Sequence, residues 1–351
     1  MARLPRVALV GANGMLAVAV KRLLGAAGNP PAELDLPGFD VSDREAVRRG
    51  LGELGPELIV NCAAYTDVDG CEAREELAAQ VNGQGPGYLA EAARELGAAL
   101  VHLSTDYVFD GAKGEPYTEE DPPNPLCAYG RSKLLGERRV LESGLDRFYV
   151  VRTSWLYGPG GKNFVETIAR LAGERDELRV VADQVGCPTY TEDLAQAIFR
   201  LLGWGAVGVA RSAAGGEAAR LPDATGPWSI AGGGGSQTPH PLPVTRHPSP
   251  PYGIYHASGE GSCTWHAFAE EIVARLREGG PVRVRAVRPI RTEEYPVAAR
   301  RPSYSVLSKE KLRRATGASL PPWPDALRRY FAVRSTVALT PTDDGPRTTD
   351  I

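Results

Sequence analysis

The 351-residue sequence lacks an excess of basic residues, since 40 Lys and Arg stand against 43 Asp and Glu and the formal net charge is -3. Nucleic-acid-binding proteins usually carry a basic patch or stripe, so this balance argues against that class. No stretch reaches the roughly 18 apolar residues that a membrane span needs. The apolar run at 6–10 is too short for a signal peptide, and no cleavage site follows it. We therefore expect a cytoplasmic protein with no membrane partner.

Cysteine is also scarce, with five residues that never occur as C-x-x-C. An odd number of scattered thiols excludes a regular disulfide framework and a cysteine-rich zinc site. The composition, 42% hydrophobic and 24% charged, is that of an ordinary globular protein. The length is sufficient for a nucleotide-binding domain and a smaller second part.

What the sequence does contain is an alternation of strand-like and helix-like segments up to about residue 200. Strands are expected at 6–10, 57–63, 99–104 and 147–154, and helices at 14–27, 76–97 and 132–143. Such alternation predicts βαβ units and a doubly wound, Rossmann-like parallel sheet with helices on both faces. The fold class is therefore α/β.

Residues 203–250 break this pattern, because they are dense in Gly, Pro and Ser and show little periodicity. We interpret them as a flexible insertion, either a tolerated loop or a functional lid. A strand, a turn and a helix are expected again at 252–276, and ordered segments continue to about residue 331. The tail 332–351 is predicted to be disordered.

The first strand leads into "GANGMLA", in which Gly11, Gly14 and Ala17 form a G-x-x-G-x-x-A pattern that opens a helix. A pyrophosphate can approach the backbone at such a helix start only where no Cβ blocks it. An acidic residue about 20 positions further on is expected to accept from the ribose 2′-hydroxyl. Asp35 fits this spacing and favours NADH, although it could also simply begin a turn. Asp40 is a second acidic residue nearby, which could meet the adenine end or cap the next helix.

The motif "STDYVFDG" follows the strand at 99–104 and places Thr105 and Asp106 at its carboxyl end. Open α/β sheets bind ligands at this edge, so a hydroxyl here could bond a substrate oxygen. The alternative is that Ser, Thr and Asp only form a turn.

In "CAYGRSK", Tyr129 and Lys133 are four residues apart, which places them on one face of a helix. A phenol has a pKa near 10, so it needs a nearby positive charge to exchange its proton at neutral pH. Lys133 would supply that charge, Tyr129 would protonate a carbonyl oxygen during hydride transfer, and Thr105 would hold the oxygen. The spacing alone is common by chance; the glycine turn and the hydroxyl-bearing strand end make it specific.

Taken together, these motifs resemble the extended short-chain dehydrogenase/reductases, and within them the dTDP-4-dehydrorhamnose reductase family. Apart from the insertion, the resemblance covers nearly all of residues 5–331. Its most specific pieces are "STDYVFDG", "RTSWLYG" and "DQVGCPT", which occur in family order. The resemblance implies an NAD(P)-binding domain mainly in 1–160 and a substrate-binding part mainly in 161–331, interleaved with the first.

The resemblance also implies roles for single residues. Thr105, Tyr129 and Lys133 would be catalytic, and Thr105, Asp106 and Trp155 would meet the sugar. Trp155 could instead be a core aromatic residue. Besides Tyr129 and Lys133, the residues implied for the cofactor are Gly11, Gly14, Met15, Leu16, Asp40, Val41, Ala63, Ala64, Tyr65 and Leu103. Asn163 and Arg301 are candidate contacts to the substrate diphosphate, with helix capping and surface charge as the alternatives.

The sequence departs from the family at two places. The 203–250 segment is normally short, and prolines interrupt the expected second strand, so both NADH and NADPH remain open as cofactors. Some members bind Mg²⁺ through glutamates; Glu192, Glu293 and Glu294 are the candidates, but their spacing demands no metal. A homodimer is also compatible with the resemblance.

The leading hypothesis is NAD(P)H-dependent reduction of dTDP-4-dehydro-β-L-rhamnose to dTDP-β-L-rhamnose. A 4-ketoreductase for another dTDP-deoxysugar has the same core motifs, and a nucleotide-sugar epimerase would consume no net cofactor. A non-catalytic subunit resembling the regulatory β subunit of methionine adenosyltransferase is an alternative of another class. The complete set of Thr105, Tyr129 and Lys133 argues against it.

Overall fold

The computed structural model describes residues 4–205 and 247–334. At its centre is a six-stranded sheet in the order β10-β5-β4-β3-β1-β2, in which every neighbouring pair is parallel. Its strands are β1 (Val7–Val10), β2 (Ala32–Leu34), β3 (Leu58–Asn61), β4 (Ala99–Thr105), β5 (Phe148–Thr153) and β10 (Gly253–His256). The predicted doubly wound parallel sheet is confirmed.

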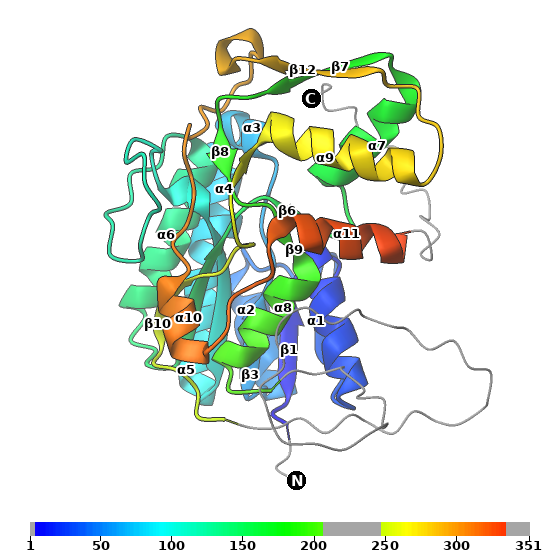
Figure 1. Cartoon of the computed structure of the whole chain (residues 1–351). Helices are drawn as coiled ribbons and strands as arrows, with labels where there is room; N and C mark the ends of the chain where they lie inside the picture. The colour runs from blue at the N-terminus through cyan, green and yellow to red at the C-terminus, as the bar shows by residue number, and fades with distance from the viewer. Residues whose placement is uncertain (1–3, 206–246, 335–351) are drawn as a thin grey trace, which may run out of the picture.

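Helices cover both faces of this sheet (Figure 1). Apolar side chains of α1 (Met15–Ala26), α8 (Thr191–Leu201) and α10 (Glu310–Thr316) form the core on one face. Those of α2 (Arg44–Leu54), α5 (Gly85–Leu96) and α6 (Ala128–Glu142) form the core on the other. The strand order reverses between β1 and β3, and open α/β sheets bind ligands beside such a point.

A second, smaller unit has its own apolar core (Figure 1). Its helices are α7 (Phe164–Glu174), α9 (Trp265–Glu278) and α11 (Trp323–Arg334). Helices α7 and α9 pack against the parallel pair β7 (Glu177–Val181) and β12 (Ala286–Ile290), and α11 packs against α9 and β9 (Thr189–Tyr190). Two further short strand pairs are β6 (Leu156–Tyr157) with β9, and β8 (Val185–Gly186) with β11 (Cys263–Thr264). The remaining short helices are α3 (Val68–Ala73), α4 (Glu75–Ala78), η1 (Ala79–Gln84), η2 (Asp106–Val108) and η3 (Thr292–Glu294).

Three elements differ from the sequence-based prediction. The helix expected at 76–97 is divided, because residues 79–84 form a π-helical segment before α5 begins. Helix α6 begins at Ala128 rather than at 132, because Cys127 is extended and its Sγ accepts from the N–H of Gly130 at 3.5 Å. The second strand is only three residues long, in keeping with the prolines around it.

Both ends of the 203–250 segment are anchored to the fold. Trp204 is buried and packs edge-on against Phe199, with ring centroids 5.0 Å apart. The N–H of His247 donates to the carbonyl of Gly203 at 2.7 Å. The rest of this segment, 206–246, lies outside the described residues, as does 335–351 of the predicted tail. Residues 332–334 continue α11, where Arg334 pairs with Glu166 at 2.8 Å.

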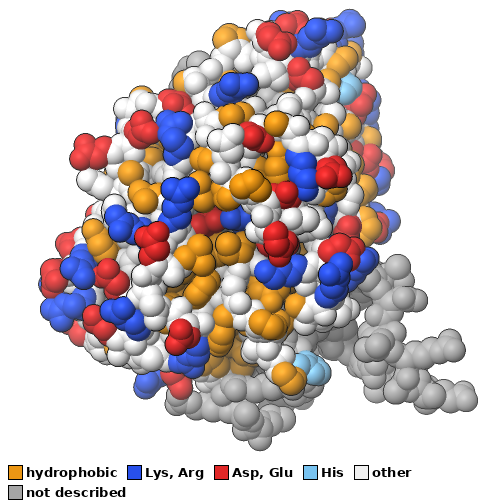
Figure 2. All heavy atoms as spheres, turned by 90° about the vertical axis from the view of Figure 1, so that its left-hand side faces the viewer, with side chains coloured by type: hydrophobic (Ala, Val, Ile, Leu, Met, Phe, Trp, Pro, Cys, Tyr) orange, Lys and Arg blue, Asp and Glu red, His pale blue; other side chains and the backbone are white. Residues whose placement is uncertain are grey.

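Within the two described ranges, no helix is long and apolar enough to cross a membrane. The face shown in Figure 2 carries basic and acidic side chains interspersed, with hydrophobic ones gathered toward its middle. Neither sign of charge dominates that face.

Candidate active site

The glycine turn between β1 and α1 forms a cradle of backbone N–H groups. Gly11 has a φ of +74°, and a Cβ added to it would lie 2.4 Å from the backbone nitrogen of Ala63. Only glycine lets the turn pass this close to the loop after β3. Helix α1 begins at Met15 after Gly14, without a capping side chain or an acidic residue in its first turn. Its first N–H groups and positive dipole end therefore fit a pyrophosphate.

Other predicted cofactor residues line the same sheet edge. The Asp35 carboxylate accepts from the N–H groups of Asn13 and Leu36, each at 2.8 Å. The bond to Asn13 also fixes the glycine turn. Asp40 accepts from the N–H and hydroxyl of Ser42, and buried Val41 packs under α5. The side chain of Leu16 is buried in the core, so its contribution to a cofactor would be its backbone. The roles themselves stay predictions.

The loop after β3, which contains Ala63, Ala64 and Tyr65, is held in place by a residue that sequence reasoning missed. Asn82 accepts from the N–H of Tyr65 at 2.8 Å and donates to its carbonyl at 2.9 Å. The same amide donates to the hydroxyl of Ser132 on α6 at 3.0 Å. Asn82 is fully buried in the π-helical segment, and no local sequence pattern predicts that irregularity. One amide thus ties the predicted cofactor loop to the helix of Tyr129.

Tyr129 and Lys133 lie one turn apart on α6 and face the carboxyl end of β4. Lys133 is 2% exposed, and its Nζ donates to the carbonyl of Leu103 at 2.6 Å. The hydroxyl of Thr105 hydrogen-bonds to the Tyr129 phenol. The structure therefore brings Thr105, Tyr129, Lys133 and Leu103 together, as the sequence predicted. This is the geometry that a proton donor beside a hydride acceptor requires.

The pKa values of Tyr129 and Lys133 both depart from their ordinary values. Burial raises the pKa of Tyr129, the Asp106 carboxylate raises it further, and the Thr105 hydroxyl lowers it. The expected lowering of the phenol pKa by the Lys133 ammonium stays a prediction. Burial lowers the pKa of Lys133 itself to about 8. Both groups are thus protonated at neutral pH, which is the state that a phenol needs to act as an acid.

Asp106 lies directly behind Thr105 and is 1% exposed. Its Oδ1 accepts from the Thr105 hydroxyl at 3.1 Å, while its Oδ2 is buried without a partner of hydrogen-bond geometry. Burial raises the pKa of Asp106 to about 7, and the hydroxyls of Ser305 and Thr105 offset part of this rise. Hydroxyls of Ser305 and Thr105 thus already lie beside the carboxyl, and its contact with a sugar hydroxyl stays a prediction.

Trp155 marks the boundary between the two units. Its φ is +47°, a conformation that non-glycine residues seldom adopt. Its ring stacks on Trp265 of α9, with centroids 3.4 Å apart and planes 7° apart. Gly186 lies under the same ring, where a Cβ would come within 2.4 Å of it. Trp155 is partly buried and packs against the apolar core of the second unit, so a core role accounts for part of its surface and its contact with a sugar stays a prediction.

Of the two candidate diphosphate contacts, Asn163 has a clear structural role. It caps α7 by accepting from the N–H of Glu166 at 3.1 Å, and its amide donates to the carbonyls of Gly158 and Gly161. Arg301 instead pairs with Asp69 of α3 at 2.9 Å, and its Nε is buried without a partner.

Arg301 also faces a cavity of about 470 Å³ between the segment after β4 and the segment after η3. The charged lining residues are Arg300, Arg301, Asp110, Asp183 and Glu293, and polar ones include Gln184, Thr292 and Ser303. Two adjacent arginines in a cavity of this size can recognise a phosphate-bearing group.

The candidate magnesium ligands do not converge. Glu192 pairs with Arg22, and Glu294 pairs with Arg179 at 2.9 Å. Throughout 4–205 and 247–334, no three His, Cys, Asp or Glu side chains form a group that could hold a metal ion. The residues present thus do not fit a magnesium site, and no step is assigned to a metal.

Comparison with known proteins gives the family. The RmlD substrate binding domain model matches residues 5–214 and 242–335. The dTDP-4-dehydrorhamnose reductase of Streptomyces griseus is 40% identical over 327 residues, 93% of each chain. A Streptomyces antibioticus protein named as a probable dTDP-4,6-dihydroxy-2-methyloxan-3-one 4-ketoreductase is 38% identical over 324 residues, covering 92% of this chain and 93% of its own.

A solved structure agrees with these matches. The dTDP-4-dehydrorhamnose reductase of Bacillus anthracis, in complex with NADP, has a TM-score of 0.77 and 35% identity, and the match covers 94% of this chain and 99% of that one. The predicted resemblance is confirmed by family model, sequence and structure alike. The chain belongs to the family described as RmlD substrate binding domain, the dTDP-4-dehydrorhamnose reductases.

Proposed function

We propose that this protein is an NAD(P)H-dependent reductase that converts dTDP-4-dehydro-β-L-rhamnose to dTDP-β-L-rhamnose. The observation that carries this function is the cluster of Thr105, Tyr129 and Lys133 at the end of β4, beside the glycine turn. Reductase names on relatives that match almost the whole chain support it.

Each side chain has a defined part in the reaction. When bound at the glycine turn, NAD(P)H would provide the hydride that reduces C4 of the keto sugar. Tyr129 donates its phenolic proton to the C4 oxygen, so the carbonyl becomes a hydroxyl, and the phenolate regains a proton from solvent. Thr105 holds the oxygen through its hydroxyl. Lys133, fixed by the Leu103 carbonyl, keeps a positive charge one turn from the phenolate that forms.

Binding of the nucleotide sugar is assigned to both units. Asp106 accepts from a sugar hydroxyl with its unpartnered Oδ2, and the exposed part of Trp155 packs against the sugar ring. Arg301 and Arg300 in the 470 Å³ cavity suit the diphosphate charge. Asn163 contributes indirectly, because it fixes the loop at 158–163 beside Met15 of α1.

A 4-ketoreductase for another dTDP-deoxysugar is the second candidate. The Streptomyces antibioticus relative is nearly as similar as the rhamnose-forming one, at 38% against 40% identity. The two candidates share the same proton donor and hydride geometry, so the difference lies in the shape of the sugar pocket.

A sugar panel tests the proposal. Purified protein is given NADH or NADPH with dTDP-4-dehydrorhamnose and with related dTDP-4-keto sugars, and cofactor oxidation is followed at 340 nm. Oxidation that is fastest with dTDP-4-dehydrorhamnose is expected. Fastest turnover of another keto sugar would select the second candidate, and no oxidation with any sugar and either cofactor would overturn both.

Tyr129→Phe is the matched variant, because it removes only the phenolic oxygen. Turnover should fall by roughly a thousandfold or more, as for loss of a general acid. Binding of NADH should stay nearly unchanged. A fully active variant would refute the proton-donor role.

A homodimer and a cytoplasmic location stay predictions. Sedimentation of the purified protein tests whether it is a homodimer.

A further inference from the structure

Behind the catalytic cluster lies a row of polar residues at one level of the sheet. Ser104 on β4 pairs in register with Arg152 on β5, and Arg152 pairs with His256 on β10. Their exposed fractions are 4%, 2% and 0%. Ser104 immediately precedes the catalytic Thr105, so this row borders the reaction site directly.

Glu137 of α6, which is 1% exposed, contacts Ser104 and Arg152 of this row. Its two oxygens accept from Arg152 at 2.9 and 2.7 Å, and one of them also accepts from the Ser104 hydroxyl at 2.5 Å. The guanidinium of Arg152 lies over the ring of Phe109. A bidentate arginine pair has a defined geometry, so it fixes position as well as charge.

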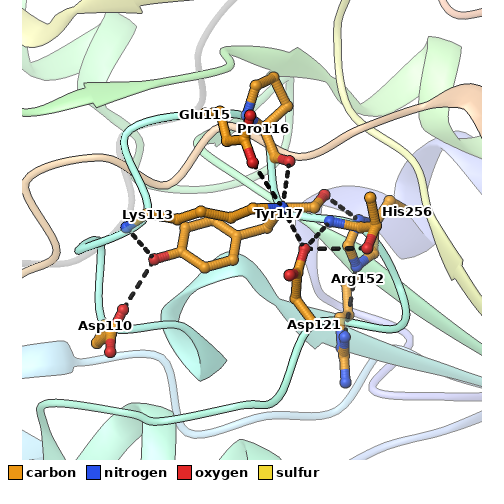
Figure 3. A network of polar contacts seen from close by, with 9 residues as sticks. Asp110, Lys113, Glu115, Pro116, Tyr117, Asp121, Arg152 and His256 are labelled. Carbon is orange, nitrogen blue, oxygen red and sulfur yellow. Dashed lines mark hydrogen bonds and ion pairs between the residues drawn. The ribbon is translucent and has the colours of Figure 1, made fainter.

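His256 completes the support of Arg152 on its other side. Its Nδ1 lies 3.1 Å from the carbonyl of Tyr117 and therefore carries the proton, so Nε2 accepts from Arg152 at 3.4 Å. Figure 3 shows Tyr117, Arg152 and His256 together; the Tyr117 hydroxyl donates to Asp110 at 2.8 Å and accepts from the N–H of Lys113 at 3.1 Å. The Glu137–Arg152 pair is thus held on both sides, by Ser104 at the carboxylate and by His256 at the guanidinium.

Tyr129, Lys133 and Glu137 follow one another at intervals of four residues along α6. They therefore share one face of the helix. Each contacts the end of β4: Tyr129 through Thr105, Lys133 through the Leu103 carbonyl, and Glu137 through Ser104. The contacts of Tyr129 and Lys133 are those of the proposed reaction. The contact of Glu137 with Ser104 holds the same face of α6 against β4.

We propose that Glu137, bound by Arg152 and Ser104, is a positioning residue that sets where Tyr129 and Lys133 stand against β4. This inference rests on the proposed reductase function. Both oxygens of Glu137 are taken up by Arg152 and Ser104, so it acts through its neighbours on α6 rather than on the substrate. It also places a carboxylate one helical turn from the ammonium of Lys133.

The groups that face Lys133 come from three elements. Cys62 follows β3, His102 lies on β4, and Glu137 lies on α6. Burial raises the pKa of Cys62 to about 12 and lowers the pKa of His102 well below its usual range, so both are neutral near pH 7. Of these three groups, Glu137 is the one that carries charge, and it raises the pKa of Lys133 against the effect of burial.

Glu137→Gln tests the proposal with readouts that a purely structural role would not change. We expect kcat to fall by about tenfold or more, with NADH binding and the KM for the sugar nucleotide within about threefold. The alkaline limb of the kcat profile should move to lower pH, because Lys133 loses its proton more easily without the carboxylate. Glu137→Asp should recover part of the rate and of the limb.

Asp193→Asn is the matched control, because Asp193 forms a comparable bidentate pair with Arg329, joining α8 to α11, and neither helix carries a residue of the catalytic cluster. It should lower the thermal midpoint yet leave kcat and the pH profile unchanged. Ser104→Ala removes one bond to Glu137 and keeps the ion pair, so it should fold and lower kcat by roughly threefold.

The outcomes separate cleanly. If Glu137→Gln lowers the thermal midpoint but keeps the wild-type kcat and alkaline limb, the proposal is wrong. If that variant does not fold, the double variant Glu137→Gln/Arg152→Met leaves no unpaired buried charge and decides instead. A wild-type kcat in the double variant would overturn the proposal, and a low kcat would support it. An inactive wild-type protein would overturn the reductase function first and this inference with it.

Discussion

Asp106→Asn should stabilise the protein, and the gain should grow with pH. Asparagine has nearly the same shape, keeps the oxygen that accepts from Thr105, and cannot ionise. The pKa of Asp106 rises from 3.8 to about 7 on folding, because the carboxyl is buried. Ionised Asp106 therefore costs the folded state up to about 4 kcal/mol relative to the unfolded chain.

The sign follows from proton binding. Between about pH 4 and pH 7 the folded state keeps a proton that the unfolded state has lost, so the stability contributed by this group falls as pH rises. The asparagine variant lacks that loss. From pH 5 to pH 8, the free energy of unfolding of the variant should therefore gain about 3 kcal/mol on that of the wild type.

Urea unfolding of both proteins at pH 5, 6, 7 and 8 measures this difference, provided the m-values agree. Asp110→Asn is the control, because three hydrogen bonds lower the pKa of Asp110. Its stabilising effect is complete above the ordinary pKa and is lost only at lower pH, so its difference from wild type should be flat from pH 5 to 8. An equally flat difference for Asp106→Asn would refute the reasoning.

Further variants test the cofactor and sugar sites. Gly11→Ala should weaken NADH binding by about a hundredfold in a fluorescence titration, since its Cβ would meet Ala63 and its φ is positive; Gly25→Ala, with no atom within 4 Å of its new Cβ, should bind normally. Asp35→Asn should raise the kcat/KM ratio of NADPH to NADH by about tenfold, because the repulsive charge is removed; an unchanged ratio would exclude Asp35 from cofactor selection. Trp265→Ala should raise the KM for the sugar nucleotide by about tenfold through loss of the Trp155 stack, and an unchanged KM would remove Trp155 from the sugar site.

The clustering of the proposed catalytic residues could be predicted because these residues are encoded by local patterns. Tyr129 and Lys133 need only a helix to meet, and Thr105 needs only the end of an apolar strand. Periodicity also predicted the parallel sheet, since buried strands and amphipathic helices alternate. In each case the signal lies within a window of a few residues.

The remaining features depend on contacts between distant segments. Asn82 acts from an irregular helix turn, and Arg152 meets Glu137 only after β5 has paired with β4. A signal for Glu137 did exist, namely its position four residues after Lys133. Trp265 had none, because it meets Trp155 across 110 positions and only through the packing of α9.

The contact between Gly203 and His247 has a consequence for how the chain can vary in length. The two residues are hydrogen-bonded neighbours, so the chain leaves the fold and re-enters it at one point. The ends of α8 and β10 are therefore held in place by a contact that does not depend on how many residues lie between Gly203 and His247. The family model likewise passes over residues 215–241. This junction is therefore a natural place at which relatives can gain or lose sequence, and at which a foreign domain could be grafted while the catalytic residues stay in place.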